Sequence, residues 1–69
     1  MSYTSNIRRL FDLRPGDEFT FRGGNSRLYA LVSIDRRKVT LKILSGFNRG
    51  QIVYLTDAKN DSVIHYRRF

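Results

Sequence analysis

Residues 27–44, RLYALVSIDRRKVTLKIL, contain two stretches of strand-forming residues joined by a short charged segment. Val39 to Leu44 alternates between apolar residues, expected to face a core, and Thr40 and Lys42, expected to face solvent. In Arg27 to Asp35 both alternate rows are apolar, so this strand is either central in its sheet or changes face at a bulge. The two stretches predict a β-hairpin with a tight, charged turn at Asp35–Lys38.

The chain on either side of this hairpin predicts three further strands. They are Glu18–Arg22, Gln51–Leu55 and Ser62–Arg68, with turns at Gly23–Ser26 and Ser45–Gly50 and a polar link, Thr56–Asp61, that can form one turn of tight helix. Five short strands at this spacing indicate a small closed or half-closed barrel. Closure would also remove the edge strands through which β-proteins aggregate.

The segment Thr4 to Phe11 carries the helix signal of this chain. Ile7, Leu10 and Phe11 fall at positions i, i+3 and i+4, and Pro15 ends the pattern. We therefore predict one mainly β domain over residues 1–69. It consists of a short N-terminal helical segment at 1–13 and a five-stranded barrel at 14–69.

Composition excludes several classes of site. The 69 residues include no cysteine, and His65 is the one histidine, so neither a disulfide framework nor a structural zinc site is expected. We predict no cofactor. No apolar run is long enough for a signal peptide or a membrane span, so we expect a soluble cytoplasmic protein with no membrane partner.

The run Arg14 to Phe21, RPGDEFTF, followed by Gly24, resembles the opening of SH3-like barrels, in particular KOW and Tudor-like modules. The resemblance covers Pro15 to Tyr66 and implies a five-stranded SH3-like barrel. Arg27 and Leu28 stand where the KOW pattern has a second glycine. The chain is also similar to the small accessory proteins that bacteriophages encode, which implies a regulatory role in the host cytoplasm.

Charge is the strongest functional signal. Thirteen Lys and Arg oppose six Asp and Glu, which gives a formal net charge of +7, and ten of the thirteen are arginine. Arginine matches phosphate with two hydrogen bonds and stacks on bases, so this composition predicts a nucleic-acid partner, DNA or RNA, contacted mainly through phosphates. The candidate contact residues are Arg8, Arg9, Arg22, Arg27, Arg36, Arg37, Lys38, Lys42, Phe47, Arg49, Arg67 and Arg68.

Phe47 is in this set because it lies in a turn between glycines, beside Arg49, where a role in the core is least expected. Bases stack on exposed aromatic rings, which strengthens the binding of nucleic acid. Tyr29, Tyr54 and Tyr66 are further candidates, but we expect their rings to pack in the core or at its rim.

Catalysis is not expected. His65 has no partner in the sequence pattern that would orient it as a base, and the five aspartates fall at caps and turns, where backbone hydrogen bonding explains them. A protein-interaction module stays open as the alternative: a phage-type regulator or inhibitor, or an assembly subunit, docking an acidic surface through the same arginines. Both functions require that the arginines gather on one side of the folded domain, and the sequence does not show which side.

Overall fold

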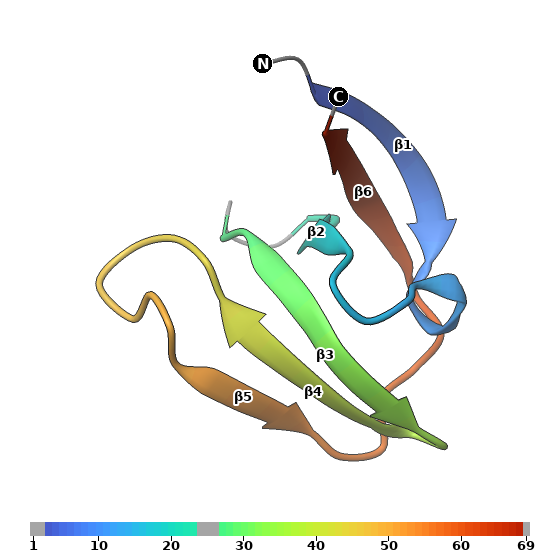
Figure 1. The fold of residues 1–69 in the computed structure, drawn as a ribbon. Helices are drawn as coiled ribbons and strands as arrows, with labels where there is room; N and C mark the ends of the chain where they lie inside the picture. Colours follow the sequence, from blue (N-terminus) through green and yellow to red (C-terminus); the bar gives the residue numbers. More distant parts are fainter. Residues whose placement is uncertain (1–2, 24–26, 69) are drawn as a thin grey trace.

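The chain forms one open antiparallel sheet in the computed structural model, which describes residues 3–23 and 27–68, the side chains of Tyr3 and Arg68 excepted (Figure 1). Its elements are β1 (Tyr3–Arg9), a 3-10 turn η1 (Leu10–Asp12), β2 (Glu18–Phe21), β3 (Tyr29–Asp35), β4 (Lys38–Ile43), β5 (Ile52–Leu55) and β6 (Ser62–Arg68). The strand order is β1-β6-β2-β3-β4-β5, so β1 and β5 are the two edges. The mainly β class is confirmed. Gly24 to Ser26 of the predicted turn lie outside the described residues.

The β3–β4 hairpin has the predicted pattern. Val39, Leu41 and Ile43 are buried, and Lys42 faces solvent. The β3–β4 register shifts between Leu31 and Ser33, which is the bulge that two apolar rows in one strand indicate. β3 lies between β2 and β4, so it is an interior strand as well as a bulged one.

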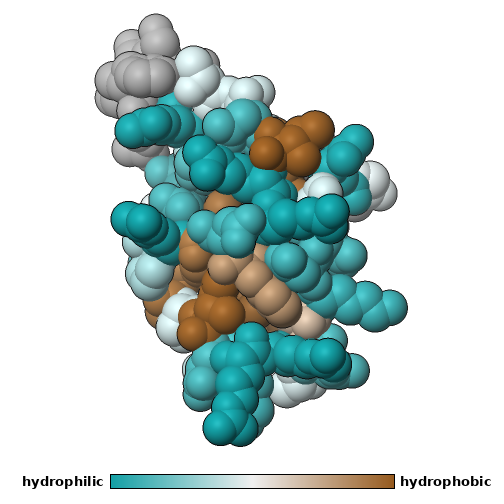
Figure 2. Space-filling view, turned by 90° about the vertical axis from the view of Figure 1, so that its right-hand side faces the viewer, coloured by the Kyte–Doolittle hydropathy of each residue, from teal (hydrophilic) through white to brown (hydrophobic). Residues whose placement is uncertain are grey.

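The core lies on the inner face of the curled sheet and is closed by the segment after β1. Seven buried residues form it: Leu10, Leu13, Phe19, Leu31, Val39, Leu41 and Val63. Phe19, Phe21 and Tyr29 pack ring on ring, with centroids 5.3 to 5.9 Å apart. Such pairs add stability beyond the area they bury. Seen from the right-hand side of Figure 1, the surface is largely hydrophilic, with a hydrophobic area in the lower half of the view (Figure 2).

The predicted N-terminal helix is wrong. Residues 3–9 form strand β1, which pairs with β6 from Tyr3↔Arg68 to Arg9↔Ser62, and only a 3-10 turn follows. Ile7 is 60% exposed, whereas Leu10 is buried, so the apolar spacing that suggested one helical face does not describe one surface. A helix this short is marginal in water, whereas β6 offers a full ladder of backbone hydrogen bonds.

The predicted five-stranded barrel is also corrected, because the described chain has six strands and the barrel is not closed. The added strand explains the open form. A strand has two hydrogen-bonding edges, and β6 uses one for β2 and the other for β1. No edge of β6 is left to receive β5, so β5 pairs with β4 alone.

The sequence predicted the turn before β2 correctly but not the conformation of the link between β5 and β6. The Pro15-Gly16 turn is confirmed: the Asp17 N–H donates to the Arg14 carbonyl at 3.0 Å, and Gly16 takes a left-handed φ of 95°. The link at 56–61 forms no helical turn, contrary to expectation. Instead, a hydrogen bond joins it to the tip of the β3–β4 hairpin, where the Ala58 N–H donates to the Arg37 carbonyl at 2.9 Å.

Candidate nucleic-acid interface

The turns after β2 and β4 both lie at the end of the β3–β4 hairpin opposite its tip (Figure 1). Backbone and side-chain hydrogen bonds hold the start of β3 against the second turn. The Leu44 N–H donates to the Leu28 carbonyl at 2.8 Å, and the Leu28 N–H donates to Ser45 Oγ at 3.0 Å. Arg27, the residue before Leu28, is therefore placed beside the loop that carries Phe47 and Arg49. We call Arg22, Arg27, Phe47 and Arg49 the basic end.

Phe47 is fully exposed and takes no part in the core. Its loop is nevertheless well hydrogen-bonded. The Arg49 N–H donates to the Gly46 carbonyl at 3.3 Å and the Gln51 N–H to the Asn48 carbonyl at 2.9 Å. Gly46 and Gly50 have φ of 81° and 90°, conformations that glycine adopts without cost. The phenyl ring is thus presented to solvent on an ordered turn, as base stacking requires.

The basic end contains no acidic residue. The chain has no Asp or Glu between Glu18 and Asp35, and none between Asp35 and Asp57. Six residue steps of β3 separate Tyr29 from Asp35, about 20 Å of extended chain. This distance is more than twice the Debye length of about 8 Å at physiological salt. The acids at the hairpin tip therefore do little to offset Arg27 and Arg49.

Lys42 and Tyr54 extend this surface onto the outer face of the sheet. Lys42 is opposite Ile52, and Thr40 is opposite Tyr54, so the ammonium and the phenol lie diagonally across β4 and β5. Tyr54 is 73% exposed, which corrects the expectation that its ring packs in the core or at its rim, whereas Tyr29 packs against the core and Tyr66 is half-buried. An exposed ring beside a cation suits a polyanion carrying bases.

The hairpin tip, which holds Arg36, Arg37 and Lys38, is a mixed-charge region. The guanidinium of Arg37 lies 3.3 Å from the Asp57 carboxylate, and Lys38 is paired in register with Asp35. All of these side chains are exposed, so the ion pair adds little stability. It does, however, reduce the positive potential here, and the tip is separated from the basic end by the length of the hairpin.

A second mixed-charge region brings together residues from both ends of the chain. Arg8 and Arg67 line an open hollow of about 510 Å³ with Arg14, which the sequence did not single out. Asp12, Asp17 and Glu18 line the same hollow. Three cations and three acids make it electrically balanced, so Arg8 and Arg67 carry less weight in polyanion binding than their sequence positions suggested.

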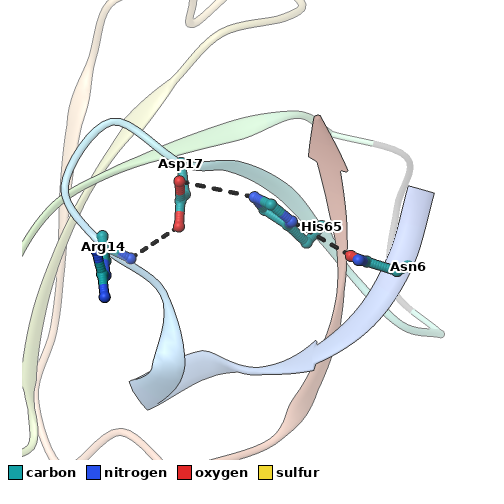
Figure 3. Close-up of polar contacts among 4 residues, drawn as sticks. All are labelled: Asn6, Arg14, Asp17 and His65. Carbon is teal, nitrogen blue, oxygen red and sulfur yellow. Dashed lines mark hydrogen bonds and ion pairs between the residues drawn. The ribbon is translucent and has the colours of Figure 1, made fainter. Parts of the chain in front are cut away.

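His65, which lines this hollow, has two partners that the sequence pattern did not reveal (Figure 3). Its Nδ1 lies 3.3 Å from Asn6 Oδ1, and its Nε2 lies 3.7 Å from Asp17 Oδ1. Asp17 Oδ2 accepts the Arg14 N–H at 2.8 Å, which confirms the local backbone role expected of this aspartate. Asn6 is 59 residues from His65, so only the β1–β6 pairing brings them together. Because both ring nitrogens face protein groups, the arrangement fixes the ring in place.

The remaining candidates lie apart from the basic end. Arg9 donates to the Asn60 carbonyl at 3.3 Å from the edge strand β1. The side chain of Arg68 lies outside the described residues. The structure therefore divides the twelve candidates among several regions and brings Arg22, Arg27, Phe47 and Arg49 to one end, with Lys42 adjoining them.

No protein-family model, no curated protein and no solved structure matches this chain. The resemblance to SH3-like modules and to phage accessory proteins therefore stays a prediction. Within the described residues, no helix has the length and apolar character needed to cross a membrane.

Proposed function

We propose that this protein binds nucleic acid, DNA or RNA, mainly through phosphates, and that its basic end is the contact surface. The observation that carries the proposal is the grouping of Arg22, Arg27 and Arg49 with a fully exposed Phe47 on a surface without acids. None of these three arginines has an ion-pair partner among the described residues. The role is binding, without catalysis, in an accessory or regulatory capacity.

The chemistry follows from the residue types. A guanidinium donates two parallel hydrogen bonds to a phosphate and keeps its charge at any physiological pH. Each phosphate that is neutralised releases condensed counterions, so affinity falls with salt. Three arginines on three phosphates predict a slope of log affinity against log salt of about −2 to −3. Phe47 adds stacking where the bases are unpaired, which favours single strands.

The test is a salt titration of binding to single-stranded and double-stranded DNA and RNA, with two charge-matched double variants. Arg27→Gln/Arg49→Gln removes two cations from the basic end and is expected to make the slope shallower by about 1.5. Arg36→Gln/Arg37→Gln removes the same charge from the hairpin tip and is expected to change the slope by less than half as much. Equal effects of the two pairs, or no binding at low salt, would contradict the proposal.

The same titration separates this function from docking on an acidic protein. An acidic protein surface lacks the condensed counterions of a nucleic acid, so the slope for such a partner would be shallow. A pull-down repeated after nuclease treatment gives an independent reading. If a protein is still captured after nuclease treatment, and every nucleic acid binds weakly, the basic end would be a protein-binding surface and the proposal would be overturned.

A further inference from the structure

The edge strand β5 is unprotected against pairing with another strand. Residues 51–56, QIVYLT, carry no charge, no proline and no glycine, and β5 ends the sheet. Natural edge strands are usually blunted by charge, proline or a bulge. The other edge, β1, has Arg8 and Arg9, whereas β5 exposes Ile52 and Tyr54.

The backbone groups that β5 presents to solvent can be assigned. The Ile43 N–H donates to the Gln51 carbonyl at 2.9 Å, and the Gly50 N–H donates to the Ile43 carbonyl at 2.7 Å. Successive residues of a strand point their N–H and C=O groups to opposite sides. Val53 and Leu55 therefore bond to β4, and the N–H and C=O groups of Ile52 and Tyr54 point to the free edge.

We propose that β5 pairs antiparallel with β5 of a second copy of this chain, about a two-fold axis at Val53. In this register Ile52 is opposite the partner's Tyr54, and Tyr54 is opposite the partner's Ile52. These are the residues whose backbone groups are free, so they form two hydrogen-bonded pairs. Each pair also places an aromatic ring beside a β-branched side chain, which is a stabilising cross-strand contact.

Side-chain pairing within β5 selects this register. A two-fold axis at Tyr54 would also place residues with free backbone groups opposite each other, but it would put Tyr54 opposite the partner's Tyr54 and Ile52 opposite the partner's Thr56. An axis at Val53 instead forms two pairs of an aromatic and a β-branched side chain, both within the strand residues Ile52–Leu55.

The dimer does not depend on the proposed function. It uses the backbone edge of β5 with the side chains of Ile52 and Tyr54, whereas phosphate binding uses the arginines of the basic end, and only Tyr54 adjoins both surfaces. Two chains of net charge +7 repel each other, and a contact strand without charged residues avoids adding to this repulsion. The contact is isologous, as in every two-fold dimer, because the same residues serve both copies.

Cross-linking tests the register directly, because the chain has no native cysteine. Val53→Cys places two thiols opposite each other across the axis, in a non-hydrogen-bonded pair where Cβ atoms come within about 5.5 Å. Val32→Cys is the matched control, since Val32 is more exposed but lies on the interior strand β3. We expect Val53→Cys to form disulfide dimers at least about tenfold faster under mild oxidation. Equal rates would overturn the proposal.

Sedimentation of the unmodified chain gives the second test. We expect its average mass to rise from the monomer value to twice that value with concentration. Tyr54→Pro removes an N–H that points to the free edge and is expected to weaken the dimer by about tenfold or more relative to Tyr54→Thr, which keeps it. Thermal unfolding of both variants is the control that establishes whether they are folded. A wild-type mass that stays monomeric, or equal dimerisation of the two variants, would overturn the proposal.

Discussion

The solvent exposure of the Phe47 ring has no explanation in the stability of the fold. A large apolar ring that contacts no core residue contributes little to stability, while its loop holds it in a defined position. Tyr54 is the other strongly exposed ring, and it lies on the β5 edge. The two rings therefore belong to the two surfaces for which we propose partners.

Replacing Phe47 separates stacking from folding. Phe47→Ala is expected to weaken binding to single-stranded nucleic acid by about 1–3 kcal/mol, the usual contribution of one stacked base, and to affect a duplex much less. Phe47→Leu keeps an apolar side chain without a π-face and is expected to lose nearly as much. Equilibrium binding measured by fluorescence anisotropy checks this. Unfolding by urea should show a change below about 0.5 kcal/mol for both variants.

Asp17 shows the structural role of a carboxylate in the hollow. It accepts the Arg14 N–H at 2.8 Å and faces His65 at 3.7 Å. Asp17→Ala is expected to destabilise the fold by about 1 kcal/mol, since a backbone donor loses its partner. Asp17→Asn keeps an acceptor for this N–H and is expected to lose less than half as much. Urea unfolding of the two variants measures the difference, and equal losses would assign the effect to charge instead.

At the scale of elements, β1 and η1 form the region where the sequence pattern was most misleading. A helix over Thr4–Phe11 would bury Ile7 and Leu10 on the same face, whereas the structure buries only Leu10. Leu10→Ala is expected to cost about 2–4 kcal/mol in unfolding free energy, as truncation of a buried leucine usually does. Ile7→Ala, at a position that is 60% exposed, is expected to cost under about 1 kcal/mol. Comparable losses would favour the helix.

The remaining elements show what the sequence can predict. Strand alternation located β4 and the buried residues Val39, Leu41 and Ile43, because their period of two reflects one buried face. The bounds of β6, Ser62 to Arg68, agree with the prediction. β1 was missed because YTSNIRR has no alternation, and the side chains of residues 4–9 are exposed on both faces. Its strand conformation comes from pairing with β6, a contact between opposite ends of the chain.

The candidate site was predictable in residue type and not in arrangement. Arginine content and an aromatic between glycines pointed to Arg49 and Phe47 from the sequence alone. Nothing in the sequence showed that Arg8 and Arg67 would meet three acids, because strand order decides which charges become neighbours. The same is true of Asn6 and His65, which lie side by side only after β1 pairs with β6.

At the scale of the whole molecule, the fold separates its charges. The acids lie at the hairpin tip, in the adjoining link and around the hollow, while the turns after β2 and β4 carry cations only. The basic end and the adjoining Lys42 together carry four of the thirteen cations and no acid, so this end holds the largest share of the net charge of +7, and long-range steering favours the approach of a polyanion to it. The proposed binding of nucleic acid depends on this asymmetry more than on the total charge.

Mapping backbone amide shifts during titration with a short single-stranded oligonucleotide tests the asymmetry most directly. We expect the largest changes in amide chemical shift in residues 22–28 and 44–51, and we expect these changes to disappear together as the salt concentration is raised. The hairpin tip at 35–38 and the link at 56–61 should change little. Largest changes at the hairpin tip or around His65, or changes of equal size over the whole sheet, would contradict the account.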